Sequence, residues 1–288
     1  MRAGKIVAIV LVGLGAGLML FAAVQWLLWP NVAALATEPP SSTAFIDTYQ
    51  RRQDDAGKDT TVAWKWVAWD SISVHAKRAV VAAEDMEFFT HNGFSSSEMA
   101  VALRDALAGE RFRGASTITQ QLAKNLWLSP SRNPWRKVKE ALLTRSLERH
   151  LSKRRILDVY LNVVEFGPGV YGIEAAAQRY FAKPASGLRG HEAAMLAASL
   201  PRPSSWHPGV SSTSYARYVA DIEGRMARAT FLWRALGTPQ ALEFPLMPVP
   251  DSIPILGVDS LVIPDSIRDT VRSGPRSSRS TDRRPGPP

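Results

Sequence analysis

Two glutamates, Glu84 and Glu140, lie among polar segments whose combined pattern is hard to obtain by chance. Glu84 begins the run EDMEFFTHNG, and Glu140 ends the run RNPWRKVKE, with GASTITQQLAKN between them. Arg132 and Arg136 precede Glu140 closely. Two carboxylates and a cation cluster are the groups that transfer of a sugar from a pyrophosphate donor would need. A carboxylate can accept a proton as a base, and cations can stabilise the departing phosphate.

The cations near Glu140 are expected to share its helix face. Asn133 can cap a helix with Pro134 at its first position, where the missing N–H does no harm. Arg136 and Lys137 then lie four and three residues before Glu140 on one face. Because charged residues at this spacing usually form a solvated helix surface, the face alone does not establish a site.

A second polar face is expected on the preceding helix, over ITQQLAKNLWL. Ser116 can cap this helix, and Gln120 and Gln121 lie four and three residues before Lys124. Similar signals predict further helices from Ser95, with Glu98 in a capping box, to near Gly109, then after Ser152, over 173–181 and over 192–200.

The signals in the body of the chain are mainly helical, which predicts a mainly α protein. The best strand candidate is TVAWKWVAW, where Val62, Trp64 and Trp66 alternate. We therefore expect one small β element, a hairpin near the start of the body.

The segment 6–29 contains no charged residue and is long enough to cross a hydrocarbon core of about 30 Å as a helix. Arg2 and Lys5 precede it, and Trp26 and Trp29 lie at its far end. Positive charge marks the cytoplasmic side of a membrane and aromatic residues mark an interface. The segment is expected to be a retained transmembrane helix, with the rest of the chain outside the cytoplasm.

A cleaved signal peptide is the alternative, since Ala34-Leu35-Ala36 fits an A-x-A cleavage pattern. The apolar run is longer than the usual apolar region of a signal peptide, which favours the anchor.

The chain is expected to contain five parts. They are a cytoplasmic N-terminus (1–5), the transmembrane helix (6–29), a linker (30–42), one catalytic domain (43–237) and a disordered Pro- and Arg-rich tail (238–288).

Composition narrows the setting. The 288 residues carry a formal net charge of +9, much of it from the C-terminal tail, so the body is only mildly basic. That suits an anionic small substrate or a lipid surface, and no nucleic-acid recognition motif is present. With no cysteine, the chain has no disulfide, thiol nucleophile or zinc–cysteine site.

Five motifs together resemble family 51 glycosyltransferases. They are EDxxFxxHxG from Glu84, GxSTITQQLxKN from Gly114, RKxxE from Arg136, and the later blocks ILDVYLNVVEFGPGVYGIEAAAQRYFAKPA and HEAAMLAASLPRPSSWHPG. The resemblance runs from about Trp64 to Gly209 and is strongest to the monofunctional, membrane-anchored peptidoglycan glycosyltransferases of proteobacteria. The long tail departs from that pattern.

The resemblance implies a lysozyme-like helical glycosyltransferase domain. It implies an enzyme of cell wall biogenesis that joins lipid II disaccharides by inverting β-1,4 transfer and releases undecaprenyl pyrophosphate. The expected location is the inner membrane, with the catalytic domain on the periplasmic side. Expected partners are lipid II, the growing glycan strand, the membrane and other cell-wall synthesis proteins, with no nucleic acid.

The resemblance also implies roles for individual residues. Glu84 would be the base, and Glu140 would assist the leaving group or bind a divalent cation, Mg²⁺ or Mn²⁺. No organic cofactor is expected. The implied substrate-binding residues are Ser116, Thr119, Gln121, Lys124, Arg132, Arg136 and Lys137.

Two neighbours of Glu84 are expected to be structural. Asp85 follows Glu84 directly and would point about 100° away on a helix. His91, in a His-x-Gly turn, is expected to satisfy backbone groups.

Two other classes of protein remain open. A lysozyme-like lytic glycosidase also uses a glutamate in a helical domain, but it has no need of the lysine and arginine faces. A non-catalytic, membrane-anchored cell-wall scaffold would be expected to have lost Glu84 or Glu140, and both are present. A transpeptidase domain is not expected, because S-x-x-K and K-T-G are absent.

Overall fold

The computed structural model describes residues 2–96, 100, 116–129, 133 and 135–237. The chain divides into a unit of residues 1–244 and a unit of residues 245–288, the second of which lies outside the described residues. The expected tail and most of the helix expected from Ser95 to near Gly109 also lie outside them.

The described chain is mainly helical, as predicted, and contains a small sheet. Its elements are α1 (Arg2–Leu27), η1 (Val32–Ala36), α2 (Ala44–Asp55), β1 (Ala63–Trp64), η2 (Trp69–Ser71), α3 (Val74–Glu84), α5 (Ile118–Trp127), α6 (Trp135–His150), α7 (Lys153–Val163), β2 (Glu165–Gly167), β3 (Val170–Tyr171), α8 (Ile173–Phe181), η3 (Ala185–Gly187), α9 (Gly190–Ser199), α10 (Thr213–Arg228) and α11 (Phe231–Gly237).

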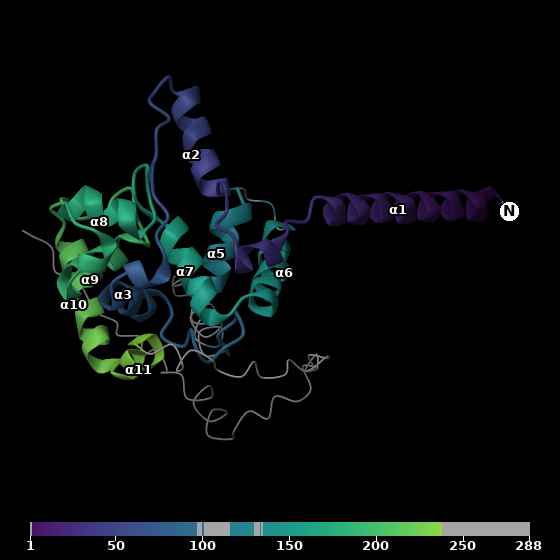
Figure 1. Ribbon diagram of the computed structural model, residues 1–288. Coiled ribbons are helices and arrows are strands. Elements are labelled where there is room, and N and C mark those ends of the chain that lie inside the picture. Colours follow the sequence, from purple (N-terminus) through teal and green to yellow (C-terminus); the bar gives the residue numbers. More distant parts are fainter. Residues whose placement is uncertain (1, 97–99, 101–115, 130–132, 134, 238–288) are drawn as a thin grey trace, which may run out of the picture. The chain divides into compact units, whose positions relative to one another are not determined.

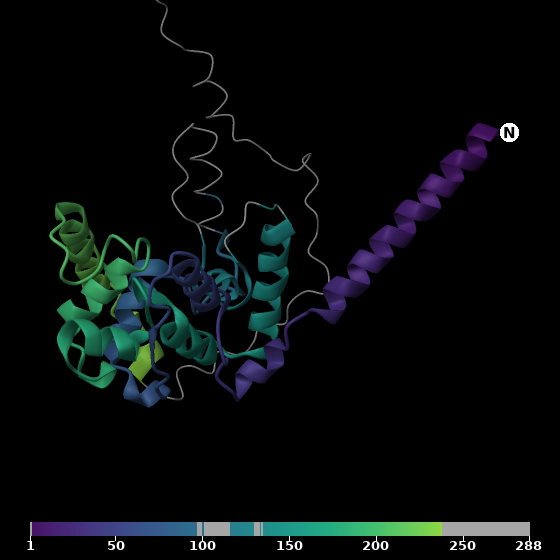
Figure 2. The same cartoon turned by 90° about the horizontal axis from the view of Figure 1, so that it is seen from above.

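Helix α3 is buried along its length. Figures 1 and 2 show it between α9 and α10 on one side and the group α5, α6 and α7 on the other. Its Ala79 and Ala82 are fully buried, as are Ala194 and Ala198 of α9. Small side chains let the two helices pack closely, and close packing fixes the position of the last residue of α3, Glu84.

The transmembrane span expected over 6–29 is not confirmed. Among the residues that the structure describes, no helix combines the length and the apolar composition needed to cross a membrane.

The segment 30–42, expected to be a linker, is partly structured. Within it η1 buries Val32 and Leu35 in the core, and the Leu35 carbonyl accepts a hydrogen bond from Arg155 Nε at 2.6 Å. This part of the chain therefore belongs to the folded body.

The small sheet has the strand order β1-β3-β2, and it corrects the expected position of the hairpin. The antiparallel pair is β2 with β3, and β1 joins β3 in parallel. Asn162 explains why so little of TVAWKWVAW is strand. Its Oδ1 accepts from the Val67 N–H at 2.9 Å and its Nδ2 donates to the Val67 carbonyl at 3.1 Å, so a side chain takes up two backbone groups that a longer strand would have paired.

A glycine makes the turn from β3 into α8. Gly172 has φ +78°, and a Cβ there would lie 2.5 Å from the Asn162 carbonyl oxygen. Only glycine fits this corner without backbone strain.

Most of the predicted helix starts are confirmed. The Trp135 N–H donates to Asn133 Oδ1 at 2.9 Å, the Arg155 N–H donates to Ser152 Oγ at 3.3 Å, and α8 has the predicted bounds. The cap expected at Ser116 was wrong, because Thr117 caps α5 in a capping box with Gln120.

Candidate active site

Among the described residues, Glu84 accepts a hydrogen bond at one carboxylate oxygen and none at the other. Its Oε2 accepts a hydrogen bond from Gln121 Nε2 at 2.7 Å. Its Oε1 is buried and has no hydrogen-bond partner among the described residues. Burial raises the pKa of Glu84, and the Gln121 hydrogen bond and the charges of Lys124 and Arg225 oppose that rise. A carboxylate in this state can take a proton from a ligand at Oε1.

Tyr160 fixes the orientation of the Gln121 amide. The Tyr160 hydroxyl donates to Gln121 Oε1 at 2.8 Å, which directs the amide NH₂ toward Glu84 and, at 3.3 Å, toward the Ser116 carbonyl. Burial raises the pKa of Tyr160 well above its usual value, so its phenol keeps its proton. Sequence reasoning did not single out Tyr160, whose spacing in α7 is that of a core residue.

Helix α10 adds two further residues that sequence reasoning missed. Arg225 Nη1 donates to the carbonyl of Ala83, next to Glu84, at 3.3 Å. The Arg225 guanidinium also lies 5.9 Å from the Tyr218 ring centroid. The signal that could have revealed this helix is the apolar spacing of Tyr215 and Val219, continued by the buried Ile222 and Met226.

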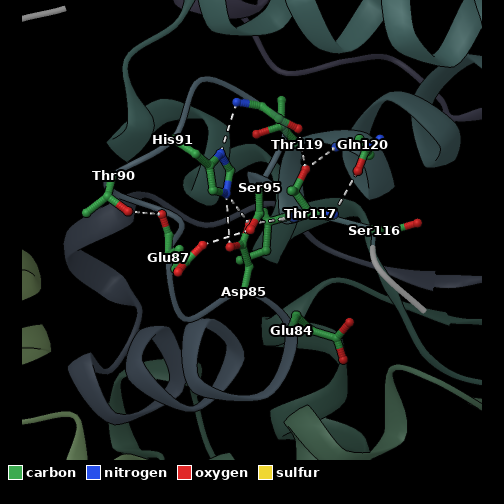
Figure 3. Close-up of polar contacts among 12 residues, drawn as sticks. Glu84, Asp85, Glu87, Thr90, His91, Ser95, Ser116, Thr117, Thr119 and Gln120 are labelled. Atoms are coloured by element: carbon green, nitrogen blue, oxygen red, sulfur yellow. Dashed lines mark hydrogen bonds and ion pairs between the residues drawn. The ribbon is translucent and has the colours of Figure 1, made fainter. Parts of the chain in front are cut away.

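Asp85 and His91 form a cluster of hydrogen bonds with each other and with the backbone N–H groups of Ile118 and Gly93. Asp85 accepts from His91 Nε2 at 3.0 Å and from the Ile118 N–H at 3.0 Å, while His91 Nδ1 accepts from the Gly93 N–H at 3.0 Å. Figure 3 shows Asp85 directed toward His91 and Glu84 directed away from both. The expected structural roles of Asp85 and His91 agree with these contacts.

Glu140 lies on α6, where its side chain is 4% exposed and forms an ion pair with Lys137, which is 63% exposed. The predicted shared face of these two residues is thus present. The Arg136 side chain, on the same helix, forms no hydrogen bond or ion pair within the described part of the chain.

Lys124 interacts electrostatically with both glutamates. Burial lowers its pKa, while the charges of Glu140 and Glu84 oppose that effect. Its ammonium group makes no hydrogen bond or ion pair with any described residue. A half-buried, unpaired cation is suited to bind an anionic group of a ligand.

Two predicted substrate-binding residues have other positions or lie outside the description. Thr119 is fully buried and donates to Glu148 Oε1 at 2.5 Å, an oxygen that also accepts from Lys153 Nζ at 2.7 Å. This places Thr119 in a structural network away from Glu84. Arg132 lies outside the described residues.

The side chains around Glu140 do not by themselves form a metal site. The described residues contain no group of three or more His, Asp or Glu side chains that could hold a metal ion. Glu140 offers one carboxylate, and Lys137 already pairs with it. A divalent cation at Glu140 would therefore need most of its oxygen ligands from the substrate.

Comparison with known proteins gives consistent matches. The family model described as Transglycosylase matches residues 53–227. A biosynthetic peptidoglycan transglycosylase of Azoarcus sp. (strain BH72) is 46% identical over 211 residues, covering 71% of this chain and 89% of the relative. Proteins with the same description from Laribacter hongkongensis (strain HLHK9; 41% identical, 74% and 94% covered) and Aromatoleum aromaticum (strain DSM 19018 / LMG 30748 / EbN1; 47% identical, 66% and 83% covered) are also similar.

Proposed function

This chain belongs to the transglycosylase family and is a peptidoglycan glycosyltransferase, and we propose that it extends glycan strands by an inverting transfer in which Glu84 is the base. Its substrates are lipid II and the growing strand. The observation that carries the proposed mechanism is the state of Glu84, with Oε2 fixed by Gln121 and Oε1 buried without a partner among the described residues.

Glu84 acts on the acceptor. Its Oε1 takes the proton of the acceptor 4-hydroxyl as that oxygen attacks the anomeric carbon of the donor from the face opposite the pyrophosphate. The new C–O bond forms as the bond to the pyrophosphate oxygen breaks, which inverts the anomeric configuration. The raised pKa of Glu84 suits this role, since a base is most effective when its pKa lies near the working pH.

Lys124, Arg136 and Lys137 act on the leaving group. As the bond to the donor breaks, negative charge increases on the pyrophosphate, and preorganised cations stabilise that charge in the transition state. Lys124 and Arg136 make no ion pair with described residues, so they can bind phosphate without first losing a protein partner. Glu140 keeps Lys137 in place through their ion pair. Any Mg²⁺ or Mn²⁺ would supply further positive charge there.

The unpaired cations also favour polymerisation over the lytic alternative. A lysozyme-like glycosidase protonates an alkoxide leaving group and uses an acid at that position rather than a lysine or an arginine. A non-catalytic scaffold would not require a buried carboxylate whose free oxygen costs stability.

We further propose that the N-terminal segment attaches the enzyme to the inner membrane, with the catalytic domain on the periplasmic side. The support is the charge-free run over 6–29 and the exposure of its apolar side chains, for example 66% for Leu14, 68% for Leu20 and 78% for Leu27. A lipid-linked substrate also requires an enzyme that works at a membrane surface.

The function is tested by giving the purified, full-length protein lipid II in detergent and, separately, preformed peptidoglycan. We expect long glycan strands from lipid II and no soluble fragments from peptidoglycan. Lys124→Ala should reduce strand formation, while Lys58→Ala, an exposed lysine after α2, should not. Release of soluble fragments without strand synthesis would show a lytic enzyme, and inactivity in both assays would favour a scaffold.

A further inference from the structure

A cavity of about 330 Å³ lies among four helices, away from the glycosyl-transfer residues. We call it the α9 pocket. The lining residues that matter here are His75 and Arg78 of α3, Gly190 and His191 of α9, Glu223 of α10 and Trp233 of α11.

Arg78 brings a buried positive charge to the α9 pocket. The residue is 5% exposed, and its Nη2 donates to the Met226 carbonyl at 2.7 Å. Its guanidinium carbon lies 3.7 Å from the Trp233 ring centroid. Among the described residues its buried Nε has no hydrogen-bond partner, and no carboxylate forms an ion pair with the guanidinium. A buried guanidinium without an anion is costly, so an anionic ligand would stabilise it.

The N-terminus of α9 brings a second positive element. Gly190 and His191 are its first two residues, where helix N–H groups and the helix dipole favour an anion. Glu192 in the same turn accepts from the Arg189 N–H at 2.9 Å and pairs with Lys183, and it does not line the pocket. Gly190 lies beside His75, since a Cβ there would be in van der Waals contact with His75 Nδ1 at 3.9 Å. The imidazole of His75, the helix N-terminus and Arg78 therefore line the same cavity.

One acid, Glu223, also lines the α9 pocket, and its partner is His191 rather than Arg78. Glu223 Oε1 lies 2.9 Å from His191 Nδ1, so these two side chains pair with each other. Arg78 stays charged although burial lowers its pKa, because a guanidinium does not lose its proton in a protein. Within the described residues the Arg78 guanidinium therefore stays charged and has no carboxylate partner, which leaves it available to an anion.

We propose that the α9 pocket binds a small oxyanion, a phosphate or a carboxylate group, between Arg78, His75 and the N-terminus of α9. The site is separate from the leaving-group cations, which lie on α5 and α6. It shares α3 with the catalytic base, since Arg78 precedes Glu84 by six residues, or about 9 Å along the helix axis. It also shares α10, which carries Arg225.

The test uses histidine NMR signals, because phosphate can also bind near Lys124. The chain has five histidines, of which only His75 and His191 line the α9 pocket. Inorganic phosphate should shift their imidazole signals along a saturable curve. The signals of His150 and His207 should stay unchanged. Each signal is assigned by a His→Gln variant.

Matched variants decide whether the pocket causes the shift. Arg78→Met should weaken phosphate binding at His75 at least tenfold, whereas Arg51→Met, which removes an equal charge from exposed α2, should leave it unchanged. If Arg78→Met does not fold, Gly190→Ala should weaken binding severalfold by narrowing the space at His75. Gly187→Ala, where a Cβ would lie 3.7 Å from Lys183 Cδ, is its control.

Titrations with different probes distinguish the possible sources of the anion. Acetate tests a carboxylate, and a soluble short-chain phosphatidylglycerol tests a lipid phosphate. A saturable His75 shift that depends on Arg78, with any of these probes, supports the proposal. It is overturned if no probe shifts His75, or if Arg78→Met and Gly190→Ala both leave the shift intact. The readout needs no catalysis, so the result does not depend on whether the proposed glycosyltransferase mechanism is correct.

Discussion

The two ends of the active site are built differently. Around Glu84 the polar groups are paired in a chain from Tyr160 through Gln121 to the carboxylate, which leaves only Oε1 without a partner among the described residues. On the side where we propose that the leaving group binds, Lys124 and Arg136 make no ion pair within that same part of the chain. In the proposed mechanism the base must be fixed before the acceptor arrives, whereas the cations would gain their partners only when the pyrophosphate binds.

The largest effect on the rate is expected at Glu84, where the surrounding side chains are paired. Glu84→Gln keeps the size of the side chain but cannot accept the proton, so strand synthesis should fall by about 10²–10⁴-fold or to background. Glu87→Gln, an exposed acid three residues later, is the control and should retain activity. The measurement is the initial rate of lipid II polymerisation. A Glu84→Gln rate equal to that of Glu87→Gln would remove Glu84 as the base.

Among the cations without an ion pair, Lys124→Ala should lower kcat by about 10²–10³-fold, because it removes one charge that stabilises the transition state. The fold should persist, since no described residue hydrogen-bonds to the ammonium group. Rates and thermal melting are measured together. An unchanged kcat would show that the pyrophosphate lies elsewhere.

Tyr160→Phe tests the hydrogen bonds that position Glu84 without changing Glu84 itself. The loss of the hydroxyl leaves Gln121 Oε1 without its donor and frees the amide to turn, which should cost about 1–2 kcal/mol, or roughly tenfold in rate. A positioning role predicts a fall in kcat with little change in KM. A stability loss without any change in kcat would limit Tyr160 to the core.

Arg225→Met should have the smallest effect at the optimum pH, and it should shift the pH profile. Removal of the Arg225 charge raises the pKa of Glu84 further, because that charge lowers it in the native protein. The base must be deprotonated to act, so the rising limb of activity should move to higher pH and the rate near neutral pH should fall. Arg228→Met, three residues later on α10, is the control. A pH profile that stays in place would contradict this coupling.

The local parts of the site could be predicted from sequence. The ion pair of Lys137 with Glu140 follows from helical spacing, and the cap at Ser152 follows from its residue type. The resemblance placed Glu84 and Gln121 in the site separately, and the hydrogen bond between them was not predicted.

Contacts set by tertiary packing could not be predicted. Arg225 meets the Ala83 carbonyl across 142 residues, and Tyr160 meets Gln121 across 39. The choice of Thr117 over Ser116 as a cap depends on a distant partner as well, since Thr117 Oγ1 donates to the Gly93 carbonyl at 2.7 Å. Thr119 points inward for the same kind of reason, because its hydroxyl donates a hydrogen bond to Glu148.

The most direct test of Glu84 uses a nucleophile that needs no base. Glu84→Ala is given lipid II with and without sodium azide, and the glycosyl product is analysed. If Glu84 takes the acceptor proton, the variant makes no strand alone. Added azide should form a bond to the anomeric carbon with inversion and release the undecaprenyl pyrophosphate, as a β-glycosyl azide appears. Strand synthesis by Glu84→Ala at the native rate without azide would contradict the account.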